Sequence, residues 1–450
     1  MPILGLKIFC FFVSVVLSGW SLLSLARLKF AAAINVALAY GLGCFWVAMQ
    51  IFIYLFIFHA SFNFIWFSLV LLFEQIIFLL ILWRRKIIVK PDLGKIWGLF
   101  KNINLKEGIV IFLIILQLVF ALSNALARPT LTYDSLAAWS FKAKVLFYEK
   151  KVNFVKGDWL YLGGGGHINY PWLVPLTQFW FAEVIGDFND LASNLIYWTF
   201  YLASLLLLYG LLRKYCERLW ALAGTWMLGS APLFFYHSSN GYADLPLAFF
   251  LLAAMGAFYI WLRGQDWRAL VLAGALIGIA YFVKNEAIIF LIALSGVFVI
   301  QLFQKNIRFK QAGAFLLSFI IVSAPWLFFQ LYYGLGLQNT ESSGLGFHPE
   351  VISPILRNFF ATGSWNIWWF IFFGALFGSL REIYRNRFLR ELWLFQLLLI
   401  GGFILLYFFT EQYLFALDFT AIGRNTIVIL PASVFVAVNT LYNLKSNDNP

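Results

Sequence analysis

The sequence predicts an all-α polytopic membrane protein, and two observations support that fold class. Hydrophobic residues make up 62% of the 450 and charged residues only 12%, whereas a soluble chain carries roughly a quarter charged residues. The apolar runs have about the length, ~20 residues, that a helix needs to cross a ~30 Å hydrocarbon core. Strand-like alternation does not dominate these runs, so helices are expected to cross the bilayer.

The apolar runs predict about thirteen transmembrane helices. They fall near residues 3–25, 31–58, 62–83, 107–127, 191–212, 219–236, 244–262, 269–283, 287–303, 311–333, 365–380, 392–410 and 426–443. The first run lacks a basic n-region and a small-residue cleavage site, so we expect a retained helix. We expect an N-terminal region at 1–104, of about three helices and a basic link, and a transmembrane catalytic region at 105–450.

The links between the runs predict an orientation. Every second link is basic, from Arg27 and Lys29 through the long link that starts at Arg84 to Lys445 near the C-terminus. The positive-inside rule places these links in the cytoplasm, with the N-terminus outside and the C-terminus inside. This anchoring accounts for the net charge of +12, so no nucleic-acid partner is expected. A long loop at about 128–190 then lies on the outer side.

Four polar clusters are predicted to converge on that outer side, and each has a structural alternative. Asp134 and Asp244 could cap the helices that follow them. Lys284 and Glu286 lie at the turn of a predicted hairpin at 270–303, where they could pair with each other or mark a functional site inside the membrane. Arg424 lies at the N-terminal end of a predicted span, where the helix dipole is unfavourable for a cation.

Arg424 therefore requires an anion. Asp418 or Glu411 could supply it, and so could a phosphate group of a lipid or a lipid-linked substrate.

The outer loop predicts two features. Residues 135–150 form an amphipathic segment that can lie in the headgroup region as an interfacial helix, with Lys142 and Lys144 on its polar side. The stretch "GGGGHINYPWLVPL" at 163–176 predicts a flexible hinge followed by a return toward the membrane, either as a slack connector or as a substrate flap. No P-loop, GxGxxG, HExxH or GxSxG motif is found, so no nucleotide-driven chemistry is expected.

Five segments carry a resemblance to a known family. "TYDSLAAWSFKAKVLFYE", "NYPWLVPL", "NGYADLPLAFFLLA", "YFVKNEA" and "GRNTIVILP" resemble, in that order, motifs of bacterial GT-C glycosyltransferases, the relatives of the protein O-mannosyltransferases and of the transferase that adds aminoarabinose to lipid A. The resemblance covers about residues 105–445, and the first three spans look like an addition. It implies a GT-C-like fold in a bacterial inner membrane, with the site facing the periplasm or the exterior.

The resemblance also implies a reaction. Such enzymes use polyprenyl-phosphate-linked sugars as donors, so the chain is expected to be a hexosyl- or pentosyltransferase. Membrane lipids are expected as further partners. Asp134 matches the acidic residue of the family's first outer loop, and Asp244 best corresponds to a second one. Protein O-mannosyltransferases carry an Asp-Glu pair where this chain has Asp134 and Ser135, so a glycolipid or glycan acceptor is expected in place of a protein.

Roles for the site residues follow from this resemblance and from their chemistry. Asp134 and Asp244 are predicted to be catalytic, with Asp134 as the general base. The predicted ligands of the donor phosphate are Lys284, Arg424 and Lys142, and the predicted substrate-binding residues are Glu286, His167 and Tyr133. A divalent cation held by Asp134, Asp244 and His237 is an alternative to a metal-free site.

Two other function classes fit a chain of this kind. One is a carrier or flippase for a polar or lipid-linked solute, because charges inside the membrane also mark transport routes. The other is a ligase that transfers a whole glycan, or a non-catalytic subunit of an envelope complex. An outer cavity in which Asp134 and Asp244 approach each other, with the cytoplasmic end sealed, would favour the transferase.

Overall fold

The computed structural model describes residues 2–28, 30–86, 103–165, 167–264, 266–304, 307–337 and 345–447, and in these ranges the regular structure is helical. An isolated bridge between Asn153 and Tyr161 is the exception. Part of the predicted basic links, including Lys29, Lys305 and residues 87–102, lies outside the described residues. The predicted all-α class is confirmed.

Nine helices of the described residues are long and apolar enough to cross a membrane, and the protein is a multi-pass membrane protein. They are α1 (Pro2–Leu25), α2 (Ala32–Phe52, prolonged by the π-helical turn η1, Ile53–Ile57), α3 (Phe64–Arg84), α5 (Leu105–Ala127), α8 (Asp190–Arg213), α11 (Asp244–Gly264), α14 (Phe309–Tyr333), α18 (Arg387–Phe409) and α20 (Ile422–Asn447). Each coincides with one of the thirteen predicted spans.

The remaining four predicted spans are helical but shorter. They are α9 (Arg218–Ser230) with α10 (Pro232–Tyr236), α12 (Trp267–Val283), α13 (Ala287–Phe303), and α16 (Trp368–Gly378), which is followed by α17 (Leu380–Arg385). The predicted single span at 219–236 is two helices, because Ala231 is extended before Pro232 and the residue before a proline is pushed away from helical geometry. Helices that are shorter than the thickness of the hydrocarbon core need protein neighbours to shield the backbone groups at their ends from lipid.

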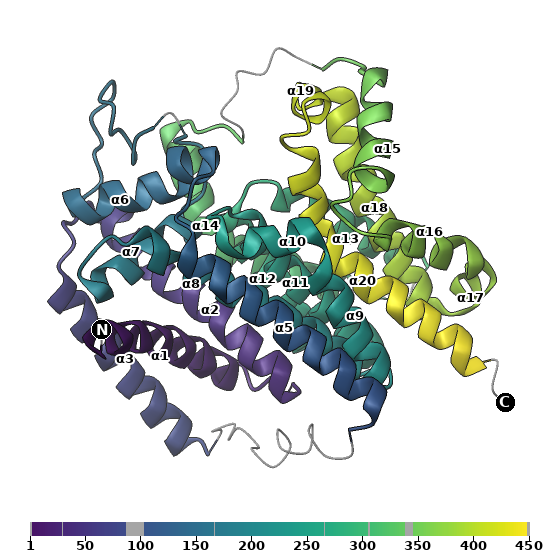
Figure 1. Cartoon of the computed structure of the whole chain (residues 1–450). Helices are drawn as coiled ribbons and strands as arrows, with labels where there is room; N and C mark the ends of the chain where they lie inside the picture. The colour runs from purple at the N-terminus through teal and green to yellow at the C-terminus, as the bar shows by residue number, and fades with distance from the viewer. Residues whose placement is uncertain are drawn as a thin grey trace.

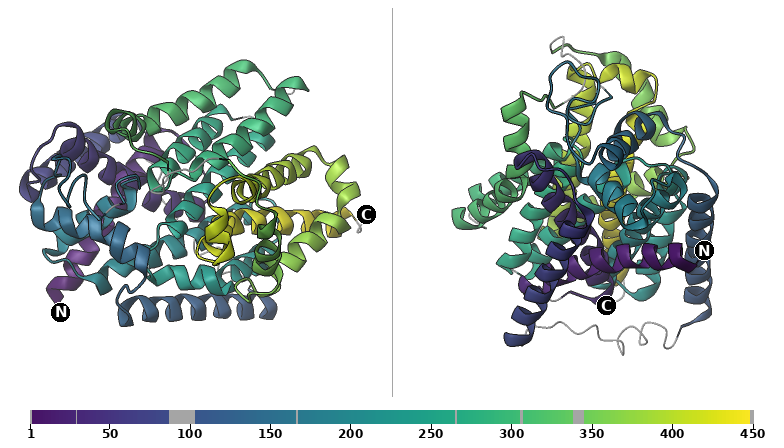
Figure 2. Two further views of the ribbon diagram at one scale, coloured as in Figure 1. Left: turned by 90° about the horizontal axis from the view of Figure 1, so that it is seen from above. Right: turned by 90° about the vertical axis from the view of Figure 1, so that its left-hand side faces the viewer.

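The helices pack into one bundle with α11 in its interior (Figures 1 and 2). Helix α11 is buried along its length and packs against α8, α12 and α20. At the edge of the bundle, α3 and α5 expose most of their apolar side chains. Helix α2 belongs to the same core, since it packs on α7 and α8 and the Tyr40 hydroxyl donates to the Ile196 carbonyl oxygen over 3.0 Å.

The outer loop is more ordered than predicted. It contains the π-helical turn η2 (Ser135–Trp139), α6 (Ser140–Glu149) and α7 (Leu173–Ile185). Helix α6 packs on α7 and buries Ala143 and Leu146 as well as the predicted polar residue Lys142. The prediction that Lys142 lies on the exposed polar face of this helix is therefore wrong, because α7 covers that side of the helix.

The first three glycines of the predicted flexible hinge form a packed turn, and Gly166 lies outside the described residues. Gly163, Gly164 and Gly165 all have positive φ angles. A Cβ atom on Gly163 would lie 2.4 Å from the Trp172 ring, and one on Gly165 would lie 2.9 Å from the Ala137 carbonyl oxygen. Glycine is required here by both the backbone conformation and the close packing.

Four other short elements lie at the end of the bundle that carries the outer loop. They are η3 (His237–Ser239), η4 (Pro349–Val351), α15 (Ile352–Phe360) and α19 (Tyr413–Leu417). Helix α19 packs on α18, and α15 packs on α16, α19 and α20. Of these elements, α19 lines the site described below, together with the turn between α12 and α13.

Two glycines let α1 and α2 approach closely, which in a membrane replaces much of the hydrophobic driving force for packing. A Cβ atom on Gly43 would lie 1.8 Å from the Val15 carbonyl oxygen, and one on Gly19 would lie 1.9 Å from that of Ala39. Both contacts are with backbone, so a side chain at either position forces the helices apart.

We expect Gly43→Ala to lower the thermal stability of the detergent-solubilised protein, because overpacking of this kind costs about 1 to 3 kcal/mol. Gly401→Ala is the matched control, since nothing lies within 4 Å of a Cβ there. Unfolding followed by size-exclusion chromatography after heating measures both variants. Equal midpoints for the two variants would contradict the close packing.

Candidate functional site

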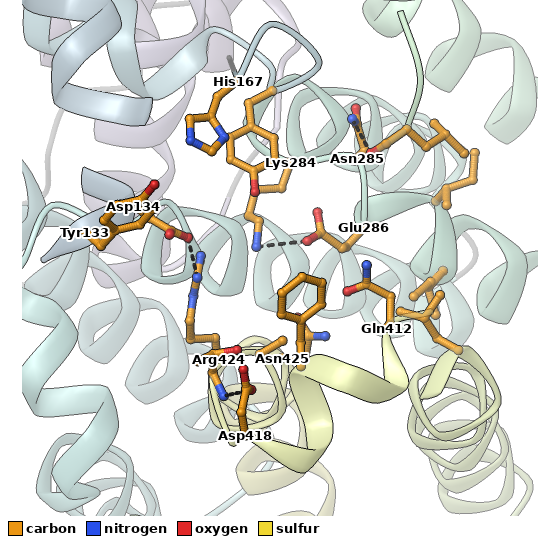
Figure 3. A pocket seen from close by; sticks show the side chains of 18 residues that line it. Tyr133, Asp134, His167, Lys284, Asn285, Glu286, Gln412, Asp418, Arg424 and Asn425 are labelled. Carbon is orange, nitrogen blue, oxygen red and sulfur yellow. Dashed lines mark hydrogen bonds and ion pairs between the residues drawn. The ribbon is translucent and has the colours of Figure 1, made fainter. Parts of the chain in front are cut away.

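A cavity of about 450 Å³ opens at the end of the bundle where α11 and α20 begin. Five segments far apart in the sequence line it: the end of the link before η2, the loop before α7, the α12–α13 turn with the start of α13, Leu337 after α14, and the region from the end of α18 to the start of α20. Figure 3 shows that Tyr133, Asp134, His167, Lys284, Glu286 and Arg424 from these segments surround one space.

Asp134 does not cap a helix. Its backbone is already helical at φ −64° and ψ −31°, and its side chain makes no capping hydrogen bond. Instead, its carboxylate accepts a hydrogen bond from Nη1 of Arg424 (Figure 3). The side chain of Asp134 keeps 21% of its surface exposed to the cavity, so the carboxylate is accessible to a ligand.

Asp244 is the partner of two cations. Its Oδ1 accepts from Lys284 Nζ over 2.9 Å and its Oδ2 accepts from Arg424 Nε over 3.0 Å. The side chain is fully buried, and Asp244 is not among the residues that line the cavity. It therefore lies behind the two cations, and the predicted pair of catalytic aspartates occupies two different layers.

Lys284 is held by a second carboxylate, that of Glu286, at 3.0 Å. The predicted pairing at the hairpin turn is thus present, together with the contact to Asp244. Between them in the sequence, the buried Asn285 donates to the carbonyl oxygens of Asn169 and Leu337 over 3.0 and 2.9 Å. Asn285 fixes the turn to the loop before α7 and to the segment after α14, so the cations stay at the cavity floor.

The anions that Arg424 requires are Asp134 and Asp244, rather than the nearby Asp418 or Glu411 that the sequence offered. The guanidinium also lies over the Tyr242 ring, 4.4 Å from its centroid. Asp418 lines the cavity but accepts hydrogen bonds from the backbone N–H and the hydroxyl of Thr420.

Two of the other predicted ligands line the cavity, and a third lies outside it. His167 and Tyr133 line the cavity, and burial lowers the pKa of the His167 imidazole. Lys142 does not line it: Nζ donates to the Tyr170 carbonyl oxygen over 2.8 Å and lies 4.6 Å from the centroid of the Trp172 ring. Burial holds the pKa of Lys142 well below its usual range.

The predicted metal-binding set does not fit a metal ion. Across the described ranges, no three His, Cys, Asp or Glu side chains are grouped as ligands, and Asp134 and Asp244 both direct Oδ2 at Arg424. His237 Nδ1 lies 3.9 Å from Asp244 Oδ2. Burial lowers the pKa of His237 to about 3, although Asp244 opposes that shift, so the ring is neutral. An arginine occupies the position between the two carboxylates where a metal would bind.

Sequence reasoning missed several cavity residues. Tyr170, Asn285 and Asn425 line the cavity, and the Tyr170 ring stacks on Trp139 with centroids 4.9 Å apart. Asn285 was detectable, because it is a third polar residue in the "KNEA" turn of an apolar hairpin. Tyr170 and Asn425 lie in segments whose polarity gives no distinct signal.

Comparison with known proteins gives three findings. A family model described as dolichyl-phosphate-mannose-protein mannosyltransferase matches residues 169–329, a segment that contains Asp244 and Lys284 but neither Asp134 nor Arg424. No curated protein sequence matches the chain.

The structure is also similar to the crystal structure of ArnT from Cupriavidus metallidurans in the apo state, with a TM-score of 0.51 and 16% sequence identity. The match covers 74% of this chain and 59% of that one, so the chain spans little more than half of the length of that protein. At this identity the similarity concerns the fold. This multi-pass protein therefore has the GT-C fold of that structure.

Proposed function

We propose that the protein is a membrane glycosyltransferase that moves a sugar from a polyprenyl-phosphate-linked donor to an acceptor hydroxyl of an envelope glycolipid or glycan. The observation that carries this proposal is the continuous chain of ion pairs from Asp134 through Arg424 and Asp244 to Lys284 at the floor of one cavity. It joins a candidate base to two cations suited to a phosphate leaving group, in a chain with the GT-C fold.

The proposed reaction is a direct displacement. The acceptor oxygen attacks the anomeric carbon, its proton passes to the Asp134 carboxylate, and the bond from that carbon to the phosphate oxygen breaks with its electron pair on the oxygen. Arg424 and Lys284 stabilise the negative charge that develops on the phosphate, and such stabilisation is stronger in a site sheltered from water. A single displacement inverts the anomeric centre.

Asp244 acts as a positioning residue in this mechanism. It contacts both cations from behind the cavity and so holds them a fixed distance from the donor phosphate. Glu286, His167 and Tyr133 line the same cavity and are proposed to bind the sugar or the acceptor.

A small apolar crevice of about 20 Å³ adjoins the main cavity. It is lined by side chains of α15, α18 and α20, including Phe359, Phe403 and Ile429, and it shares Asn425 with the main cavity. An isoprenoid chain would enter it only if these side chains moved apart. The basic links favour an orientation in which the cavity opens on the outer face of a bacterial inner membrane.

Asp134→Asn should lower sugar transfer by about 10²- to 10⁴-fold, the usual contribution of a general base, without changing the thermal midpoint. Purified protein in nanodiscs, incubated with a panel of radiolabelled polyprenyl-phosphate sugars and membrane glycolipids, measures transfer. Asp158→Asn, an exposed aspartate of the same outer loop, is the control. Undiminished transfer by Asp134→Asn would remove the base from the mechanism. Donor translocation without transfer by the wild type would favour a flippase.

Asp244→Asn should behave differently, losing both activity and stability. Breaking a buried ion pair costs about 3 to 5 kcal/mol, and here Lys284 and Arg424 each lose the buried one of their two carboxylate partners. Thermal unfolding in detergent and the same transfer assay compare this variant with Asp187→Asn, an exposed aspartate. A normal midpoint for Asp244→Asn would show that the carboxylate does not hold the cations in place.

A further inference from the structure

The Arg424 guanidinium links the two layers of the site. Its Nε donates to the buried Asp244 and its Nη1 donates to Asp134. Within the described part of the chain, Nη2 has no hydrogen-bond partner, and Arg424 is the one residue to which the Asp134 side chain is bonded. The candidate base is thus held by the cation assigned to the donor phosphate.

This contact restricts the proposed role of Asp134. Its Oδ2 accepts from Arg424, so only Oδ1 is left to meet the acceptor hydroxyl while the side chain is held in this position. The guanidinium stays protonated at any accessible pH, so this is a charge-assisted hydrogen bond, which is stronger than one between neutral groups. In this arrangement one of the two carboxylate oxygens of Asp134 is occupied by a cation.

The two contacts of Arg424 differ in how readily a ligand can replace them. Asp244 is fully buried and is also bonded to Lys284, whereas Asp134 is 21% exposed and borders the cavity. A phosphate entering from the cavity meets Nη1 and Nη2, the pair of donors that binds phosphate in a bidentate manner. Such a phosphate would displace Asp134 and leave the contact with Asp244 intact.

We propose that the donor phosphate and Asp134 compete for Arg424, so that the base is released when the donor binds. The inference rests on the proposed function and deepens it, because it makes activation of the acceptor conditional on a loaded donor site. Asp134 then has two states, paired with Arg424 in the free protein and available to the acceptor hydroxyl in the donor complex. The donor binds first in this scheme.

The competition is tested by binding, without any transfer reaction. Farnesyl phosphate serves as a short isoprenyl phosphate probe, and inorganic phosphate tests whether the phosphate group alone is sufficient, both by isothermal titration calorimetry on purified protein. Asp134→Asn removes the competitor and should tighten farnesyl phosphate binding about three- to tenfold, as expected for loss of a partly exposed ion pair to Arg424. Asp134→Ala is the second variant if the asparagine form does not fold.

Two controls separate competition from simple charge repulsion. Asp418→Asn removes a negative charge from the same cavity, but the carboxylate of Asp418 is bonded to Thr420 and has no contact with Arg424. In an Arg424→Gln background, Asp134→Asn should no longer tighten binding, because no cation is left to compete for. A double-mutant cycle measures this coupling directly.

The outcomes distinguish this inference from the function on which it rests. A gain that is confined to Asp134→Asn and requires Arg424 supports the competition. An equal gain from Asp418→Asn, a gain that persists in Arg424→Gln, or no gain at all overturns it while leaving the transferase intact. Folded wild-type protein that binds neither probe overturns both proposals.

Discussion

The fully buried carboxylate of Asp244 is the contact on which the rest of the site depends. It begins α11, and it is bonded to Lys284 at the α12–α13 turn and to Arg424 at the start of α20. A buried charge is tolerated only with partners in good geometry. This requirement fixes three helix ends to one another, and through Arg424 it also fixes the start of the outer loop at Asp134.

The length of the α12–α13 hairpin suits this arrangement. Each arm has 17 residues, or roughly 26 Å at 1.5 Å per residue, which is less than the hydrocarbon thickness of ~30 Å. The turn therefore stays inside the protein, where Lys284 and Asn285 are buried. Longer arms would carry Lys284 past Asp244 and into water, and the ion pair between these two residues would be lost.

The site consists of a buried layer that positions charges and an accessible layer that can meet a substrate. Asp244 belongs to the first, and Asp134 and Glu286 belong to the second, with Arg424 and Lys284 between them. A carrier that alternates between two faces needs charges that can exchange partners near the midplane, whereas here the buried ion pairs of Asp244 lock helix ends at one end of the bundle. That difference is why the geometry favours chemistry over transport.

The sequence by itself determined the helices and the identities of the candidate residues, because apolar runs must be helical in a bilayer and ionised side chains are rare enough there to attract notice. Only the tertiary structure decided how those residues are used. Arg424 and Asp134 are separated by 290 positions, and no local pattern reveals that they pair or that Asp244 lies behind the cavity. The burial of Lys142 and the packed turn at Gly163 likewise depend on α7 and Trp172, which contact them only once the chain has folded.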